Sequence, residues 1–343
     1  ASYGQAMANE LELAVEQVNA NGGVIDGQQL EIVLFDSQSE LTESASVATR
    51  LVGEGVVGIV GPATTGQANA QTPIIEEAGI PVILPAATGD GITLDDSGSV
   101  LEYLFRVCFE DSYQGAAAAA YATENLGAKT AAVLTDQALD YSQGLTDSFV
   151  AQFEENGGTI VTQESYTSGD TDFSAVLTSL LVQEYDVLYV PGYYTEGGLI
   201  IQQARQMGIT QPILAGDGFA SPTLIELAGA ENVNDVYFTN HFSSESEEPV
   251  VVEFMAAYEE KFGSEPDAFA ALGYDAAKLL IDAVERAGST DPEAVKDAIA
   301  ATTEFAGVTG TFAIDENHNP VKPATMITLR NGEIVNAELV SAE

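Results

Sequence analysis

Short apolar runs typical of strands alternate with longer amphipathic stretches from one end of this chain to the other. When a helix connects two strands, it carries the chain back across the sheet, so that the second strand pairs in parallel with the first. The alternation therefore favours α/β layering with largely parallel sheets. The predicted strands are residues 30–35, 56–60, 81–84, 130–134, 159–166, 187–190, 212–215 and 236–238. The predicted helices are residues 5–19, 42–53, 67–78, 113–125, 142–156, 173–183, 196–207, 248–262, 268–287 and 292–300.

The length of the chain favours two lobes, because 343 residues exceed what one hydrophobic core usually fills. Two similar series of strands and helices lie before and after a break near residues 110–112. Asn21-Gly22-Gly23 separates a helix from a strand in the first series, and Asn156-Gly157-Gly158 does so in the second. Since no low-complexity linker divides the series, we expect short crossing segments and a hinge between similar lobes.

The charge of the chain argues against two classes of partner. Fifty-three acidic and 10 basic residues give a formal net charge of −43, which opposes binding to nucleic acid or to an anionic lipid surface. Apolar residues make up 45% of the chain, but no apolar run approaches the roughly 18 residues of a membrane-spanning helix. We therefore expect a soluble, globular chain with no direct membrane insertion.

A glycine-rich stretch at residues 53–71 superficially matches two nucleotide-binding patterns. Gly53, Gly55 and Gly58 have the spacing G-x-G-x-x-G, but they precede or lie inside the predicted strand instead of following it. The Walker A alternative places Gln67 where a lysine is required. What remains is a strand, a loop and a helix start, whose free N–H groups suit a small anion such as a carboxylate.

Residues for catalysis or metal binding are scarce. Cys108 is the single cysteine, so no disulfide or cysteine-based metal cluster is expected, and its apolar neighbours predict a buried thiol. His241 and His318 belong to no H-E-x-x-H motif, and no G-x-S-x-G elbow is present. We expect neither an enzyme nor a metalloprotein, and no cofactor.

An ordered set of motifs from Tyr3 to the C-terminus resembles one known family. The segments are Asn19–Gly27, Asp36–Gln38, Gly61–Thr65, Pro85–Thr88, Asp140–Gly144, Gly192–Tyr194 and Gly216–Gly218. Together they resemble the leucine/isoleucine/valine-binding family, whose members are extracytoplasmic solute receptors of ABC importers with the type I periplasmic binding protein fold. The family normally opens with a strand before the position of Tyr3, so the first strand is expected to be missing.

The resemblance implies a domain plan and a setting. One lobe is expected at residues 1–110 plus 240–318 and the other at residues 111–239 plus 319–343, with ligand in the cleft outside the carboxyl ends of the strands. It also implies a monomer that delivers its ligand to a membrane permease from the periplasm or the cell exterior, with a lipid anchor, if any, on a segment outside this sequence.

The resemblance also implies which residues bind. Thr65 and the N–H of Thr88 would hold an α-carboxylate, while the Ala86 carbonyl and the Thr88 hydroxyl would accept from an α-ammonium. Asp217 would be the acidic anchor for the ammonium group, in place of the longer Glu of the leucine-binding branch. The expected binding residues are Tyr3, Ala63, Thr64, Thr65, Ala86, Ala87, Thr88, Tyr141, Tyr193, Asp217 and Phe219.

Purely structural roles are the alternatives for these residues. Thr65 and Thr88 could cap helices, Asp217 could form an Asx turn, and the aromatic side chains could serve packing alone. Tyr194 and Tyr274 are weaker binding candidates than the other tyrosines.

The basic residues constrain the side chain of the ligand. None of the ten falls in the loops around the expected site, so a second carboxylate would be buried without a cation. Acidic ligands are therefore not expected. The walls of the expected site are apolar or aromatic, so leucine, isoleucine or valine is expected first, and then phenylalanine or a smaller residue; these wall residues are Tyr3, Ala63, Tyr141, Tyr193 and Phe219. A ligand with a basic side chain stays an alternative, because Asp90, Asp140 and Glu196 lie close in sequence to the expected site. A sensor ectodomain of the same fold, or a binding protein for an amide, urea or an aromatic acid, is the alternative function.

Overall fold

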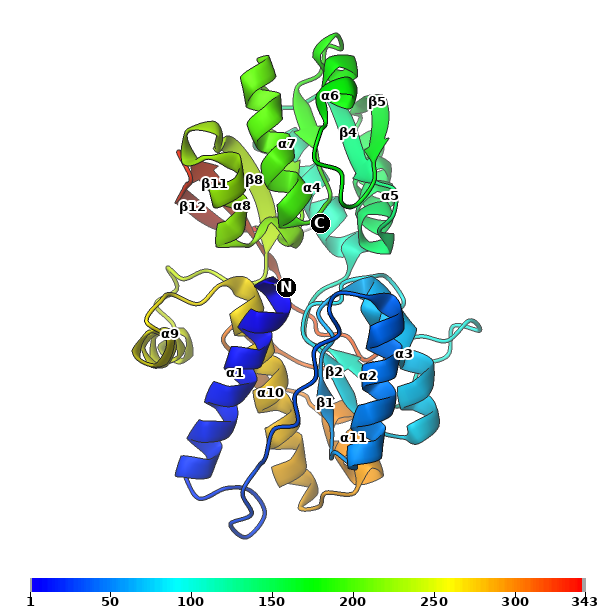
Figure 1. Ribbon diagram of the computed structural model, residues 1–343, viewed down its shortest axis with the longest axis vertical. Coiled ribbons are helices and arrows are strands. Elements are labelled where there is room, and N and C mark those ends of the chain that lie inside the picture. The colour runs from blue at the N-terminus through cyan, green and yellow to red at the C-terminus, as the bar shows by residue number, and fades with distance from the viewer. Residues whose placement is uncertain (1, 341–343) are drawn as a thin grey trace. The chain divides into compact units, whose positions relative to one another are not determined.

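The computed structural model describes residues 2–340, and these residues form two compact units (Figure 1). The first unit contains the residues up to Phe109 and Ser244–Lys322, and the second contains Glu110–Ser243 and the residues from Pro323 onward. The chain thus passes between units after residues 109, 243 and 322, where the sequence analysis placed the crossings after residues 110, 239 and 318.

The first unit has a small parallel sheet flanked by helices. The sheet contains β1 (Ile59–Val60), β2 (Val82–Leu84) and β3 (Leu104–Arg106), in that order. Its helices are α1 (Ser2–Ala20), α2 (Leu41–Glu54), α3 (Thr65–Ala78), α9 (Pro249–Phe262), α10 (Ala268–Ala287) and α11 (Pro292–Ala300). A short antiparallel hairpin completes it, formed by β9 (Phe305–Gly307) and β10 (Gly310–Phe312).

The apolar faces of these helices determine how the first unit packs. Helices α2 and α3 pack against each other and cover the sheet through a cluster that includes Ala48, Ala68, Ile75 and the fully buried Val82 and Leu84. Helices α1 and α10 lie side by side (Figure 1). The sheet is thus held with the carboxyl ends of β1 and β2 next to each other, since Val60 is in register with Ile83.

The predicted strand at residues 30–35 is wrong. The segment is not assigned to any strand, and it pairs with none of the strands within residues 2–340. Both backbone groups of Leu30 are instead bonded to the Asn19 side chain, at 2.8 and 2.9 Å. An apolar run becomes a β-strand only when a neighbour completes its hydrogen-bond ladder. Without such a neighbour, Leu34 is left 66% exposed.

The second unit is built on a seven-stranded sheet of order β12-β11-β8-β7-β6-β4-β5. Its strands are β4 (Thr130–Asp136), β5 (Thr159–Tyr166), β6 (Val187–Tyr189), β7 (Ile213–Ala215), β8 (Asn234–Asn240), β11 (Ala324–Arg330) and β12 (Glu333–Val340). The neighbours from β8 to β5 are parallel, as predicted. The last two strands, which the sequence analysis did not predict, extend the β8 edge in antiparallel fashion.

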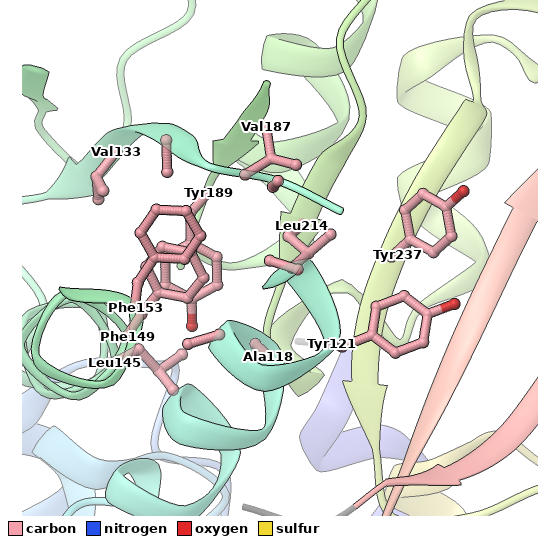
Figure 2. Packing of buried hydrophobic residues seen from close by; sticks show 14 of the residues in the cluster. Ala118, Tyr121, Val133, Leu145, Phe149, Phe153, Val187, Tyr189, Leu214 and Tyr237 are labelled. Carbon is pink, nitrogen blue, oxygen red and sulfur yellow. The ribbon is translucent and has the colours of Figure 1, made fainter. Parts of the chain in front are cut away.

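Helices cover both faces of this sheet (Figure 1). They are α4 (Asp111–Glu124), α5 (Asp140–Glu155), α6 (Ser174–Leu181), α7 (Tyr194–Met207) and α8 (Pro222–Ala228), with short 3₁₀ turns η1 (Asp217–Phe219) and η2 (Ala230–Asn232). Figure 2 shows how α5 packs on the strands through Leu145, Phe149 and Phe153, and α4 through Ala118 and Tyr121. Tyr189 of β6 stacks on Phe149, with ring centroids 3.9 Å apart.

Alternation along the strands explains this packing. Val187 and Tyr189 belong to the cluster beneath α4 and α5, whereas the intervening Leu188 does not, because successive strand side chains point to opposite faces. Leu188 is nonetheless fully buried, as expected for a parallel sheet covered on both sides. Both units are therefore α/β layered, as predicted, and within residues 2–340 no helix combines the length and the hydrophobicity needed to cross a bilayer.

Candidate functional site

Two loops of the first unit meet where β1 and β2 end. Thr65 is the first residue of α3 and is buried, and its Oγ1 accepts a hydrogen bond from the backbone N–H of Gly89 at 3.0 Å. Gly89 permits this approach, since a Cβ at that position would lie 2.5 Å from Cγ2 of Thr65. The hydroxyl of Thr65 thus joins the loop after β1 to the loop after β2 instead of capping its own helix.

Thr88 presents a polar group that the described residues do not satisfy. Its side chain is 1% exposed, and its Oγ1 has no hydrogen-bond partner within residues 2–340. Burying a hydroxyl without a partner costs free energy of the order of 1–3 kcal/mol. Thr88 does not begin a helix, so the capping alternative fails for it. Thr88 thus leaves a buried hydroxyl that can still form a hydrogen bond, next to the Gly89 N–H that bonds Thr65.

The neighbouring residues complete these two loops. Thr64 is the N-cap residue of α3, but its hydroxyl bonds the Gln67 side chain at 3.1 Å and makes no cap hydrogen bond. Ala63 is half-buried before it, and Ala86 and Ala87 are buried in the second loop. The small alanine side chains leave the backbone groups of both loops as their main polar features.

Arg106 lies against the second loop, although it is remote from that loop in sequence. Its guanidinium is fully buried, and Nη1 donates to the carbonyl oxygens of Ala87 at 3.2 Å and Gly89 at 2.8 Å. The thiol of Cys108 also donates to the Ala87 carbonyl, at 3.4 Å. Cys108 is buried, as predicted.

In the second unit, Asp217 lies in η1 directly after β7 and is almost fully buried. Its Oδ1 accepts from the Tyr141 hydroxyl at 2.8 Å and from Gln114 Nε2 at 3.2 Å, and its Oδ2 lies 2.8 Å from His241 Nε2. Three side chains therefore stabilise the carboxylate and fix its orientation. The Asx-turn alternative does not describe this arrangement, because the carboxylate contacts other elements.

The glycines on either side of Asp217 allow neighbouring groups to approach the backbone of the turn closely. A Cβ at Gly216 would lie 2.6 Å from the Tyr141 hydroxyl oxygen, and one at Gly218 would lie 2.4 Å from the Gly192 carbonyl oxygen. The N–H of Gly218 also donates to the Tyr141 hydroxyl, at 2.9 Å. The Gly-Asp-Gly sequence thus lets Tyr141 reach both the carboxylate and the backbone of the turn.

Two of the three predicted aromatic residues of the second unit lie together. The rings of Tyr141 and Tyr193 are stacked, with centroids 5.0 Å apart, and Tyr193 is the N-cap residue of α7. Phe219 is buried against α7, where a Cβ at Gly197 would lie 2.4 Å from its ring. Tyr141 and Tyr193 therefore flank Asp217, while Phe219 packs beneath the turn.

Gln114 and His241 are site residues that the sequence analysis missed. Gln114 on α4 bonds Asp217 and also Asp111 Oδ1, at 2.9 Å, and it accepts from the Thr239 hydroxyl at 2.7 Å. His241 follows β8, the parallel neighbour of β7, so the carboxyl ends of these strands bring it to Asp217. That position after a strand was the signal that could have identified it.

The buried surroundings of Asp217 also affect the pKa of Tyr189. Burial raises the pKa of its hydroxyl well above the usual value, and the charges of Asp111 and Asp217 raise it further. Tyr189 therefore stays protonated and adds no negative charge beneath the site.

The remaining predicted tyrosines lie on helices α1, α10 and α7. Tyr3, near the start of α1, is buried and packs on Phe269, with ring centroids 4.1 Å apart. The Tyr274 hydroxyl bonds Gln17 at 2.7 Å, which is a contact between α10 and α1. Tyr194 is the first residue of α7. Within residues 2–340, no three His, Cys, Asp or Glu side chains are grouped so that they could hold a metal ion.

Comparison with known proteins identifies the family. The sequence matches the periplasmic binding protein family over residues 1–333. The Leu/Ile/Val-binding protein homolog 3 of Brucella melitensis is 32% identical over 340 residues, which are 98% of this chain and 90% of that protein.

Two solved structures are similar over almost the whole chain. The branched-chain amino acid transporter substrate-binding protein LivJ of Streptococcus pneumoniae, in complex with isoleucine, is 42% identical with a TM-score of 0.94, covering 99% of this chain and 95% of that one. The leucine-binding protein LivK of Thermotoga maritima is 40% identical with a TM-score of 0.92, covering 99% and 94%. This chain therefore belongs to the leucine/isoleucine/valine-binding branch of the periplasmic binding proteins and has their type I fold.

Proposed function

We propose that this protein is the solute-binding subunit of an ABC importer and that it captures a neutral, branched-chain amino acid. The observation that carries the proposal is the pair of buried half-sites: an unsatisfied hydroxyl at Thr88 in the first unit and a carboxylate at Asp217 in the second. An amino acid can satisfy both half-sites. Its ammonium can donate to the Thr88 hydroxyl oxygen and the Asp217 carboxylate, and its carboxylate can accept from the Thr65 hydroxyl and the Thr88 N–H.

The first unit would bind the carboxylate end. The Thr65 hydroxyl already accepts from Gly89, so its own proton remains for a ligand oxygen. The Thr88 N–H is the second proposed donor. The hydroxyl oxygen of Thr88 and the carbonyl of Ala86 would then accept from the ammonium group.

The second unit would bind the ammonium end through Asp217. The three side chains on its carboxylate come from α4, α5 and the end of β8, so the charge is held in place before any ligand arrives. Such preorganisation lowers the ordering cost of binding. The stacked Tyr141 and Tyr193 would supply an aromatic wall for an apolar side chain.

The buried charges favour a neutral ligand side chain. Arg106 is the basic residue at the loops of the first unit, and its Nη1 is engaged by two backbone carbonyls. A second ligand carboxylate would therefore lack a free cation there and would be heavily penalised. The related LivJ of Streptococcus pneumoniae holds isoleucine, which agrees with this choice. We propose that the protein acts as a monomer outside the cytoplasmic membrane, where it delivers its ligand to a permease.

A melting screen tests the proposal. A ligand that binds only the folded protein raises the melting temperature, with about 2.7 kcal/mol of stabilisation at 100 times its Kd. We expect stabilisation by leucine, isoleucine or valine, and none by glutamate, urea or benzoate. Stabilisation by benzoate or glutamate without any by the branched-chain amino acids would contradict the proposal. Adjacent permease genes would separate a transport subunit from a sensor ectodomain.

A further inference from the structure

Arg106 holds the backbone of the loop that we assign to the ligand carboxylate. It ends β3, the strand next to β2, and its guanidinium reaches across to the loop that follows β2. Nη1 donates to the carbonyls on both sides of Thr88, those of Ala87 and Gly89, at 3.2 and 2.8 Å. The residue between two tethered carbonyls has little freedom to rotate.

The planar peptide bond couples the orientation of the Ala87 carbonyl to that of the Thr88 N–H. The carbonyl of Ala87 and the N–H of Thr88 belong to one peptide group, and in a trans peptide they point in opposite directions. Gly61-Pro62 is the cis bond among the described residues, so the bond between Ala87 and Thr88 is trans. By fixing the Ala87 carbonyl on one side, Arg106 fixes the Thr88 N–H on the other.

The guanidinium is itself held in place. Its Nε donates to Asn319 Oδ1 at 2.6 Å, and the Thr93 hydroxyl donates to the same oxygen at 3.5 Å. The backbone N–H of Asn319 bonds the Asp315 carboxylate at 2.9 Å, which ties this contact to the turn before it. Because the guanidinium group is planar, fixing its Nε also fixes the directions of its remaining N–H donors.

The charge of Arg106 adds to this geometry. A cationic donor makes a stronger hydrogen bond than a neutral one, and the carbonyl that it polarises makes the N–H of the same peptide a better donor. Cys108 donates to the Ala87 carbonyl as well, so two donors act on that oxygen. The Thr88 N–H is therefore both aimed and strengthened toward an anion.

We propose that Arg106 is the positioning residue of the carboxylate half-site: through the Ala87 and Gly89 carbonyls it orients and polarises the Thr88 N–H for the ligand carboxylate, which it does not itself contact. This inference rests on the proposed function. It assigns a role in ligand selectivity to a residue that the sequence places outside every loop of the site.

The test compares leucine with leucinamide, whose neutral amide accepts a hydrogen bond more weakly than a carboxylate. Calorimetric titration of Arg106→Gln should show leucine binding weakened by about 30-fold or more, the loss expected for a charge-assisted interaction. Leucinamide binding should weaken much less, so the selectivity for leucine over leucinamide should fall at least about fivefold. Arg106→Lys should recover only part of the loss, because an ammonium lacks the fork.

Arg205 provides the matched control. Its guanidinium also donates to backbone carbonyls, those of Ile209, Gln211 and Asn234, at 2.7 to 2.9 Å. These lie before β7 and at the start of β8, the opposite strand ends from Asp217. Arg205→Gln should leave the selectivity unchanged, and any stability that it loses calibrates the cost of removing such an arginine.

The outcomes separate the two proposals. Equal losses for leucine and leucinamide in Arg106→Gln, or complete rescue by lysine, would overturn the positioning role. If Arg106→Gln does not fold, Asn319→Ala removes the contact at Nε and should lower the same selectivity by a smaller factor, and unchanged selectivity would overturn the proposal. Failure of the unmodified protein to bind any branched-chain amino acid would instead contradict the proposed function.

Discussion

Asp217 is the residue whose removal should change binding most. Its carboxylate is buried, and the ligand ammonium would lose its partner in Asp217→Ala. Losing one partner of a buried charge pair typically costs about 2–5 kcal/mol, so titration calorimetry should show leucine binding weakened at least about 30-fold. Asp217→Asn keeps the shape without the charge and should weaken binding comparably. An affinity within threefold of the unmodified protein would contradict the role of Asp217.

His241 should act through Asp217. Its Nε2 lies 2.8 Å from Oδ2, so His241→Ala removes one of the three groups that orient the carboxylate. A hydrogen bond to a charged group contributes about 1.5–3 kcal/mol. We expect about tenfold weaker leucine binding, measured by calorimetry, with circular dichroism as the check on folding. Binding as tight as in the unmodified protein, or tighter, would show that the imidazole does not position the carboxylate.

Single residues show how far the sequence could predict the site. Thr65, Thr88 and Asp217 lie within a few residues of the ends of β1, β2 and β7, and ligands gather at the carboxyl ends of parallel strands, so the sequence could nominate them as candidate site residues. His241 also follows a strand, so its position offered the same signal. Arg106 could not be predicted in this way, because it reaches the loop after β2 through the pairing of β3 with β2, which depends on strand order in space.

Helix α1 carries a buried acid that makes stability depend on pH. Glu10 is fully buried, and neither carboxylate oxygen has a hydrogen-bond partner within residues 2–340. Burial, and then the charge of Asp267, raise the pKa of Glu10 to about 9, against the opposing effect of Lys261. Glu10 therefore keeps its proton in the folded state at neutral pH, whereas the unfolded chain releases it.

The sign of the effect follows from proton linkage. Between the ordinary glutamate pKa and about 9, the folded state binds more protons than the unfolded one, so the free energy of unfolding falls as pH rises. Glu10→Gln removes this dependence. We expect it to match the unmodified protein at pH near 5 and to be more stable by roughly 1–3 kcal/mol at pH near 8, by urea unfolding.

An exposed acid provides the control for this prediction. Glu77 lies on α3 and is exposed, so Glu77→Gln makes the same substitution at the surface and controls for the loss of one acidic side chain. If Glu10→Gln were destabilising at the higher pH, the buried carboxyl would have to be ionised and satisfied in the folded state, contrary to this account.

At the scale of elements, most helices were predicted within a few residues, because each repeats apolar residues along one face. The bounds of α10 and α11 agree with the prediction at both ends. Strands were harder to predict. Residues 30–35 have the composition of a buried strand but lack a ladder partner, while β3, β11 and β12 were missed because pairing, which a local pattern does not reveal, defines them.

At the scale of the whole molecule, the proposed function predicts that one ligand engages both units. An amino acid held at its carboxylate by the first unit and at its ammonium by the second links them, so binding should shift the population toward more compact forms. Small-angle X-ray scattering should show a smaller radius of gyration at saturating leucine. Asp217→Ala is the control, and its radius of gyration should decrease less than that of the unmodified protein at the same leucine concentration. An unchanged radius in the unmodified protein would count against binding by both ends.

The most direct test of the central claim is a calorimetric titration of the unmodified protein with L-leucine and with its two truncated analogues. Isocaproate keeps the carboxylate and the side chain but lacks the ammonium, and isoamylamine keeps the ammonium and the side chain but lacks the carboxylate. Because each analogue leaves one buried half-site unpaired, we predict that leucine binds at least about 100-fold more tightly than either. Binding of isocaproate or isoamylamine as tightly as leucine would contradict the account.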